Sequence, residues 1–147
     1  CQGLGQMFTQ VGIKTNVNAI SKTVYFPAYS RQEYSMFMNG WGTLTGEASY
    51  TLGGLAHSNN PEIKLGAYNR LEYKNDKVDQ LLQTGAKMMD ENKRRATYEE
   101  AMETVMADKV YISIVQLQTV WGAKAGSFEF TPRYDEDTLA YFIKSAN

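Results

Sequence analysis

The apolar residues first repeat with a helical period close to the N-terminus. Positions i, i+3, i+4 and i+7 are taken by Leu4, Met7, Phe8 and Val11. This spacing predicts one apolar face of an amphipathic helix, which Gly12 is expected to end at its C-terminal cap. Residues 13–20 then alternate apolar and polar side chains, as a half-buried strand does. A helix, a tight turn and a strand together indicate an α/β unit.

The start of the chain indicates that it is part of a longer protein. It has no initiating Met, and no capping residue precedes the first helical pattern. We therefore expect an N-terminal truncation inside or just before a helix.

A second apolar run predicts a strand inside a sheet. Residues 34–41 contain Met36, Phe37 and Met38 without a polar interruption. Such a run is typical of a strand that is covered on both faces in a parallel or mixed sheet. The glycine-rich residues 42–47 are expected to form a loop.

The segments on either side of this strand predict short helices and an irregular stretch. Residues 23–32 are weakly helical, and Pro27 is expected in the first turn of that helix. Residues 48–57 predict a short helix, whose inward-packing residues would be Tyr50, Leu52 and Leu55. Residues 58–73 carry turn signals and are expected to be irregular.

Two longer helices are predicted over residues 75–89 and 92–109. Asn75 is a good N-cap for the first, and Asp90 or Asn92 begins the second. Their apolar faces are expected to be Val78, Leu81, Leu82 and Met89 in the first helix, and Tyr98, Ala101, Met102, Val105 and Met106 in the second. The two would pack as an antiparallel hairpin against the sheet.

Beyond these helices the pattern favours strands. Residues 110–117 and 119–125 are rich in Ile, Val, Tyr and Trp. The tail, residues 128–143, is aromatic and turn-rich, with an acidic run at Asp135, Glu136 and Asp137.

Trp41 is the most informative single residue, because it stands between Gly40 and Gly42 at the end of a predicted strand. A large flat side chain between two residues without Cβ atoms lets another molecule approach the main chain closely, which indicates a recognition edge. The same pattern also fits a core strand that ends with a buried Trp. The residues alone leave both interpretations open.

Composition narrows the class of protein. The chain has 147 residues, 43% of them hydrophobic, and a net charge of -1, which fits one domain with a real core. The basic run Lys93-Arg94-Arg95 is flanked by acidic residues and predicts a solvated helix face, so we expect no nucleic-acid partner. No apolar run reaches the length of a membrane span, and the single Cys1 makes no internal disulfide.

The sequence offers little for catalysis or metal binding, so we expect a binding protein without cofactor or metal. His57 is the only imidazole, and we expect it at the surface, closing a helix C-terminus. One His and one Cys do not make a zinc pattern. A hydrolase would need Glu47 to share a cleft with Asp135 or Asp137.

Several short motifs occur in a characteristic order along the chain. They are Val11-Gly12-Ile13-Lys14, Tyr34-Ser35-Met36-Phe37, Gly40-Trp41-Gly42, Gly46-Glu47-Ala48-Ser49, Asn69-x-x-x-Tyr73-x-Asn75, Val78-Asp79-x-Leu81 and Ala101-Met102. From Gln2 to about Phe142, their order and spacing resemble the C-terminal portion of the bacterial extracellular solute-binding proteins of family 5. This family comprises dipeptide-, oligopeptide- and nickel-binding receptors of ABC importers.

The resemblance implies a fold and a division of the chain. The fold class would be α/β, a partial C-terminal lobe of a two-lobed, type II periplasmic-binding-protein-like fold, with a mixed sheet flanked by helices. Residues 1–126 would form most of this second lobe, and residues 127–147 the returning C-terminal tail. The ligand would lie between this lobe and a missing N-terminal lobe.

The resemblance also implies a ligand site. The candidate ligand-binding residues are Asn39, Gly40, Trp41, Gly42, Leu44, Glu47, Asn69 and Arg70. In peptide-binding relatives, the backbone at 39–42 pairs with an extended peptide, and an Asp three residues after the Trp holds the peptide's α-ammonium group. Leu44 stands at that position here, so a peptide with a free amino group becomes a less favoured ligand than a modified peptide, an oligopeptide bound differently or an opine-like solute. Glu47 would replace the Asp only if its loop folds back.

The implied partners are a peptide or small-molecule solute and the membrane permease subunits of an ABC transporter. The implied location is the periplasm, or a lipid anchor at the outer face of the cytoplasmic membrane. The alternative function is a self-contained protein-interaction module that uses the helical hairpin of residues 75–109.

Overall fold

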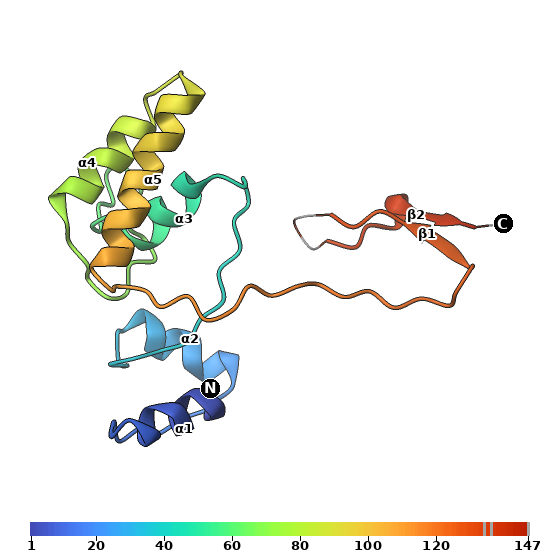
Figure 1. Ribbon diagram of the computed structural model, residues 1–147, viewed down its shortest axis with the longest axis horizontal. Helices are drawn as coiled ribbons and strands as arrows, with labels where there is room; N and C mark the ends of the chain where they lie inside the picture. Colours follow the sequence, from blue (N-terminus) through green and yellow to red (C-terminus); the bar gives the residue numbers. More distant parts are fainter. Residues whose placement is uncertain (134, 136, 147) are drawn as a thin grey trace.

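Helices dominate the N-terminal three quarters of the molecule, and a small hairpin ends it (Figure 1). The computed structural model describes residues 1–133, 135 and 137–146. Its α-helices are α1 (Gln2–Gln10), α2 (Lys22–Ser30), α3 (Ala48–Leu55), α4 (Asp76–Gly85) and α5 (Glu91–Ala107). The strands β1 (Phe128–Phe130) and β2 (Ile143–Ser145) pair antiparallel, and the 3-10 helix η1 (Ala140–Phe142) lies between them in sequence.

Helix α1 ends where the sequence predicts. Gly12 has φ +86°, its N–H donates to Thr9 O, and the N–H of Ile13 donates to Phe8 O at 2.9 Å. These two bonds form a Schellman motif, which satisfies carbonyls at the helix end and favours glycine at the left-handed position.

Side-chain caps begin both longer helices. The Asn75 side chain accepts hydrogen bonds from the N–H groups of Lys77 and Val78, so the predicted N-cap of α4 is confirmed. Asp90 accepts from the N–H of Lys93 at 3.1 Å and thereby caps α5. Each cap satisfies N–H groups that have no partner within the helix.

The hydrophobic core lies where α3 packs against the α4–α5 hairpin. Its buried residues are Leu52, Ala56, Val78, Leu82, Tyr98, Ala101 and Val105. The hairpin and most of its apolar stripe were predicted, but it packs against α3 and not against a sheet. Tyr50 and Leu55 of α3 are only half-buried.

The helical predictions fail at three points. Pro27 lies in the interior of α2 and not in its first turn, because the helix begins at Lys22. Helix α4 ends at Gly85, short of the predicted residue 89, and Met89 is 96% exposed. His57 was expected at the surface but is buried, with 2% of its surface exposed.

The predicted strands over residues 13–20, 34–41, 110–117 and 119–125 are absent from the described residues. A β-strand makes its hydrogen bonds to a neighbouring strand, and among the described residues these segments have no such neighbour. The predicted side-chain alternation survives in part, because Thr15 and Val17 are half-buried against Gly5 of α1. Met36 and Met38 are 67% and 48% exposed, so the run that was expected to be covered on both faces is open to solvent.

The chain therefore combines helices with one small sheet, which is compatible with the α/β class. In the described part of the chain, the sheet is two-stranded and antiparallel, not the expected mixed sheet flanked by helices.

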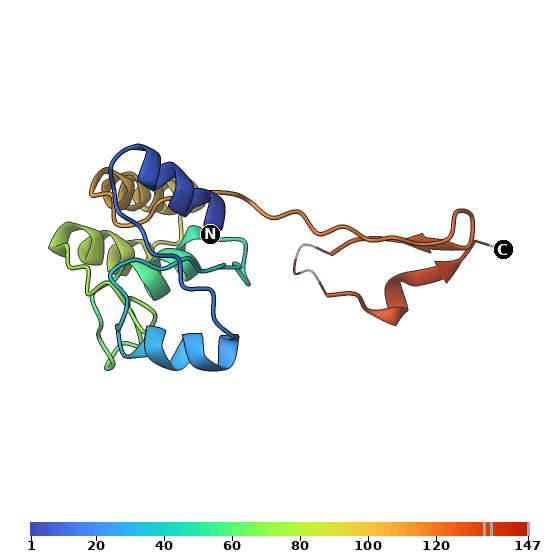
Figure 2. The same ribbon diagram turned by 90° about the horizontal axis from the view of Figure 1, so that it is seen from below.

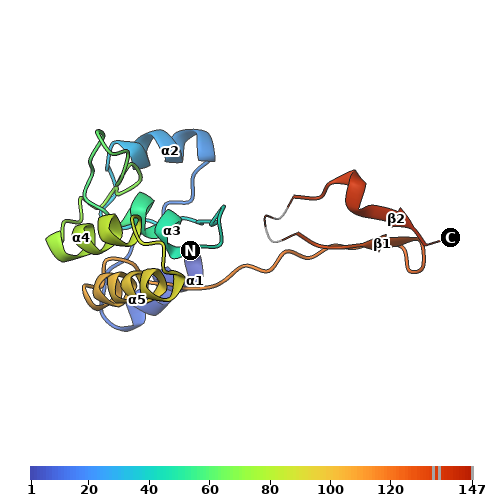
Figure 3. The same ribbon diagram turned by 90° about the horizontal axis from the view of Figure 1, so that it is seen from above.

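Residues 110–125 form a long extended segment between α5 and the C-terminal hairpin. Figures 2 and 3 agree with Figure 1 that the hairpin stands apart from the helices. The apolar side chains of the extended segment are largely exposed, namely Ile112, Ile114, Val115, Leu117 and Val120. Among the described residues, none of the helices has the length and apolar character needed to cross a membrane.

The close contact between Gly85 and Tyr98 gives the first prediction. A Cβ atom at Gly85 would lie 2.5 Å from the Tyr98 ring, so Gly85→Ala forces the ring out of the core. We expect a loss of about 2 kcal/mol in the free energy of unfolding, measured by urea denaturation. The matched control is Gly3→Ala in α1, where a Cβ meets nothing within 4 Å and helix propensity gives a gain of up to about 1 kcal/mol. Equal stability of the two variants contradicts the packing described.

Candidate functional site

Trp41 lies against α3 and is half-buried. Its indole N–H donates to Thr51 Oγ1 at 3.2 Å, and its ring centroid lies 5.7 Å from that of Tyr50 and 5.2 Å from that of Tyr68. Gly54 lies beneath the indole, since a Cβ there would be 3.4 Å from the ring. Trp41 is thus neither a core residue nor a free one: α3 and Tyr68 hold it in one orientation and leave part of it in contact with solvent.

The main chain around Trp41 is open. Asn39, Gly40 and Gly42 are exposed, and a Cβ on either glycine would meet nothing within 4 Å. Within the described residues, no hydrogen bond joins the N–H and C=O groups of residues 39–42 to another part of the chain. Internal packing therefore does not require these glycines, and their backbone groups remain available to another molecule.

Leu44 and Glu47 belong to the loop that follows Trp41. Leu44 is 67% exposed and provides no charge. The Glu47 carboxylate accepts a hydrogen bond from Arg94 Nε at 2.7 Å and from Ser49 Oγ at 3.0 Å. The Arg94 guanidinium, and then the Ser49 hydroxyl, lower the pKa of Glu47 below its usual range. Glu47 is thus bound to α5, and the loop does not fold back to place it at the position of Leu44.

An open hollow of about 630 Å³ lies beside this ion pair, between the loop and the first half of α5. The residues that line it include Thr45, Gly46, Glu47, Arg94 and Tyr98. Arg94 also donates to Met88 O at 3.3 Å, so one guanidinium links the loop, α5 and the turn before α5. The Glu47–Arg94 pair was not predicted, because 46 positions intervene and no local pattern joins the two residues.

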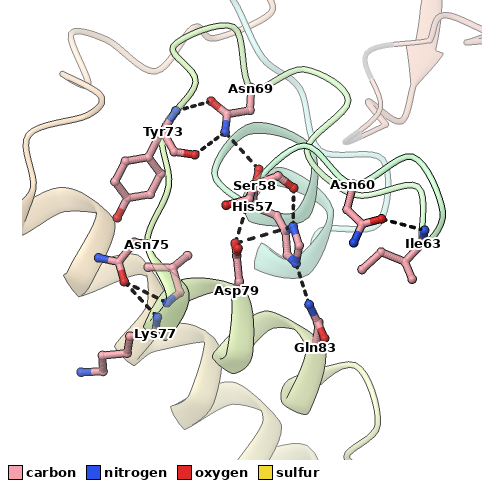
Figure 4. Close-up of polar contacts among 11 residues, drawn as sticks. His57, Ser58, Asn60, Ile63, Asn69, Tyr73, Asn75, Lys77, Asp79 and Gln83 are labelled. Atoms are coloured by element: carbon pink, nitrogen blue, oxygen red, sulfur yellow. Dashed lines mark hydrogen bonds and ion pairs between the residues drawn. The ribbon is translucent and has the colours of Figure 1, made fainter.

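Asn69 is buried, and its side chain forms hydrogen bonds with the main chain at both ends of its loop. Its amide nitrogen donates to His57 O at 3.1 Å and to Tyr73 O at 2.7 Å, and its amide oxygen accepts from the N–H of Tyr73 at 3.1 Å. These hydrogen bonds of the Asn69 side chain hold the loop of residues 58–73 in its shape (Figure 4).

Arg70, next in the sequence, combines a stacked guanidinium with an unpaired donor. The guanidinium lies 5.7 Å from the centroid of the buried Tyr29 ring, and Nη1 donates to Ala67 O at 2.6 Å. Its Nε is buried and has no hydrogen-bond partner among the described residues. Arginine in this setting suits a carboxylate or another planar acceptor.

His57 is held between the loop and α4. Its Nδ1 lies 2.6 Å from Ser58 O and 3.6 Å from Asp79 Oδ1, and its Nε2 lies 3.0 Å from Gln83 Nε2 (Figure 4). The tautomer with its proton on Nδ1 satisfies both bonds, because Nδ1 then donates to Ser58 O and Nε2 accepts from the Gln83 amide. With 2% of its surface exposed, His57 is closed off from any solute.

The acidic groups do not form a catalytic pair. Asp135 is paired with Arg133 in the C-terminal hairpin, whereas Glu47 is paired with Arg94 in the helical part. Glu136 lies outside the described residues. The structure therefore does not bring Glu47 into one cleft with Asp135, as the hydrolase alternative would require.

The structure thus joins some of the predicted site residues and separates others. Trp41 and residues 39–42 share one surface, which Tyr68 connects to the loop that bears Asn69 and Arg70. Glu47 faces the hollow at α5 instead. Tyr50 and Tyr68, which flank the indole, were missed, because aromatic residues are frequent in this part of the sequence and nothing local marks those that meet.

The Glu47–Arg94 pair predicts a pH dependence. The folded state holds the pKa of Glu47 below its unfolded value, so the pair stabilises the fold above the usual range of a glutamate and is lost as the pH falls through the lowered pKa. Glu47→Gln should remove this part of the acid sensitivity, measured as the midpoint of urea unfolding from pH 6 to pH 3 in steps of about half a unit. Glu99→Gln, a control in the same hollow, should leave the profile unchanged. An unchanged profile in Glu47→Gln means that the pair contributes nothing.

Comparison with known proteins finds similarity to glutathione-binding proteins. No family model and no solved structure matches it. It is 30% identical over 115 residues to the glutathione-binding proteins GsiB of Shigella dysenteriae serotype 1 (strain Sd197) and Escherichia coli (strain K12). The identity to GsiB of Salmonella choleraesuis (strain SC-B67) is 28% over 116 residues.

These alignments cover 75% of this chain but only 22% of each relative, so the chain spans less than a quarter of the length of the curated relatives that it matches. Each of these relatives is named as a glutathione-binding protein. This similarity agrees with the resemblance of the sequence to the extracellular solute-binding proteins of family 5.

Proposed function

We propose that this chain is part of the substrate-binding component of an ABC importer, which captures a small peptide-like solute between two lobes. The observation that carries the proposal is its 30% identity to glutathione-binding proteins. The chain would supply most of the second lobe over residues 1–126 and the returning tail over residues 127–147. Ligand binding would close the two lobes, because the solute stabilises the closed form by contacting both.

The exposed edge at residues 39–42 is the proposed contact for the solute's main chain. Its free N–H and C=O groups offer hydrogen bonds that do not depend on the solute's side chains. Trp41, supported by Tyr50 and Tyr68, would form one wall of the pocket. An aromatic wall contributes a large contact area with little loss of side-chain freedom on binding.

The charges near this edge favour a ligand bound through its carboxylates. Leu44 brings no carboxylate for an ammonium group, and Glu47 is already paired with Arg94. Arg70, by contrast, lies two residues after Tyr68, which contacts Trp41, and its Nε has no hydrogen-bond partner among the described residues. We therefore propose glutathione, a tripeptide with two carboxylates and one ammonium group, as the first ligand to test. Arg70 would bind a carboxylate, and the ammonium group would be held by residues other than Leu44 and Glu47. Asn69 would act by holding the loop in place.

The extended segment of residues 110–125 would be completed by the rest of the protein. Its sequence favours strands, and its apolar side chains are largely exposed. The matched relatives extend far beyond the length of this chain. We propose that strands of the missing N-terminal lobe pair with this segment, which accounts for predicted strands that form no sheet here.

The alternative function is an interaction module built on the hairpin of residues 75–109. The apolar face of α4 and α5 that such a module would present is covered by Leu52 of α3 and by Ala56, the residue after α3. The residues at helical spacing that form the core are Val78, Leu82, Tyr98, Ala101 and Val105. Because the core uses this face, we do not favour the alternative.

The relatives also support the cellular setting that we propose. The complete receptor would act in the periplasm and deliver its solute to membrane permease subunits. We set aside the lipid-anchored alternative, which the relatives do not support.

Replacement of Trp41 tests the pocket wall. In the complete protein, Trp41→Ala should raise the Kd for glutathione by about tenfold or more, because it removes an aromatic anchor. Calorimetry well below the melting temperature keeps the variant folded. The matched control is Trp121→Ala in the C-terminal part, which should leave Kd within about twofold of wild type. An unchanged Kd with a large fall in melting temperature would show that Trp41 serves only the core.

Replacement of the flanking glycines tests close approach of the ligand. Gly40→Ala and Gly42→Ala have open space for the added methyl group, so the melting temperature of the empty receptor should not fall. The methyl groups should nevertheless weaken solute binding, with Kd rising by about tenfold, since they obstruct the main chain at the edge. If both variants bind as tightly as wild type, the ligand does not pair with residues 39–42.

A further inference from the structure

The loop of residues 58–73 has a defined shape although it contains neither helix nor strand. A bridge between Asn60 and Leu65 closes its outer part, with N–H···O distances of 2.9 and 3.1 Å. The N–H of Gly66 donates to Gly53 O at 2.8 Å, and that of Tyr68 to Gly54 O at 3.0 Å. The loop is therefore fastened to α3 just before Tyr68 and Arg70, the two residues that face Trp41 and Tyr29.

The inner part of the loop rests on the main chain of His57 and Ser58. Gly66 has φ +70°, and a Cβ there would lie 2.4 Å from His57 O and 2.6 Å from Ser58 O. Asn69 donates to the same His57 O at 3.1 Å. Two separate points of the loop thus depend on where the peptide unit between residues 57 and 58 lies.

The side chains of His57, Asp79 and Gln83 attach the two peptide units that flank Ser58 to α4. Nδ1 contacts Ser58 O, while Asp79 of α4 accepts the N–H of Ser58 at 2.8 Å. At the other edge of the ring, Nε2 meets the Gln83 amide, one helical turn beyond Asp79. The imidazole therefore spans the space between α4, a capped helix with a buried face, and the base of the loop (Figure 4).

We propose that His57 is a positioning residue, which transmits the fixed place of α4 to the loop of residues 58–73 and so holds Tyr68 and Arg70 in the arrangement that faces the solute. His57 does not touch the solute, because it is buried. That the loop faces a solute rests on the proposed function, whereas the positioning of the loop by His57 does not.

Two substitutions separate the bonds that His57 makes from the space that it fills. In His57→Asn, the amide nitrogen takes the place of Nδ1 and can still donate to Ser58 O, but the contact with Gln83 is lost. In His57→Leu, an apolar side chain fills the space and leaves Ser58 O and Gln83 without their partner. If His57 only fills space, His57→Leu should disturb the loop less than His57→Asn does. If the bonds of His57 position the loop, His57→Asn should disturb it less.

Hydrogen exchange of the complete protein without ligand, followed by mass spectrometry, tests the proposal directly. In His57→Leu, peptides from residues 58–73 should exchange about tenfold faster than in wild type, while peptides from α5 keep their rates. In His57→Asn, the loop should exchange within about threefold of wild type, even if the melting temperature falls. Unchanged exchange of the loop in His57→Leu, or an equal increase in the loop and α5, overturns the proposal.

A second pair of variants applies if His57→Leu does not fold. Gln83 and Gln80 are both exposed on α4, but only Gln83 meets the imidazole. Gln83→Ala should raise the exchange of residues 58–73 by about two- to threefold, as far as His57→Asn does, and the control Gln80→Ala should not. Identical exchange in the two variants overturns the proposal.

Calorimetry then separates this inference from the proposed function. If wild type binds glutathione, His57→Leu should raise Kd by about tenfold and His57→Asn by less than about threefold. If wild type binds none, the proposed ligand is wrong, and the exchange experiment still decides whether His57 positions the loop.

Discussion

The packing of α3 onto the α4–α5 hairpin is the contact on which the other features of the molecule depend. Val78 and Ala101 are fully buried there, and Gly85 lets the Tyr98 ring approach α4 closely. The indole of Trp41 rests on the exposed side of α3, and the loop of residues 58–73 is bonded to α3 and α4. One small core thus determines the positions of both groups of candidate ligand-binding residues, although most of those residues lie outside it.

The helices could be predicted because their signals are local. Asn75 and Asp90 cap α4 and α5, Gly12 ends α1, and the apolar stripe of α5 follows the helical period from Tyr98 to Met106. These features act within a few residues of one another and do not depend on what else is present. The end of α4 was predicted too late in the sequence. Met89 continues the apolar spacing, but the helix ends at Gly85, which packs against the Tyr98 ring.

The strands and the site could be predicted only in part, because both depend on contacts between distant residues. Residues 110–125 have the composition of strands, yet a strand forms only where another offers hydrogen bonds. The same holds for Glu47, whose partner Arg94 lies on another helix, and for His57, whose burial depends on the approach of Asp79 and Gln83. The sequence indicated Trp41 as a candidate because its flanking glycines are adjacent to it. Nothing in the local sequence indicated Tyr68, whose ring contacts the indole.

The proposed function accounts for the exposed apolar segment and for the short alignment to long relatives by one physical cause, a lobe that the rest of a longer receptor would complete. The central claim is that the chain belongs to a two-lobed receptor, and the mass of the protein in its source cell tests it most directly. Intact-protein mass spectrometry of a periplasmic extract should detect a species several times heavier than 16.6 kDa. A native species of 16.6 kDa would lack a second lobe and would contradict the account.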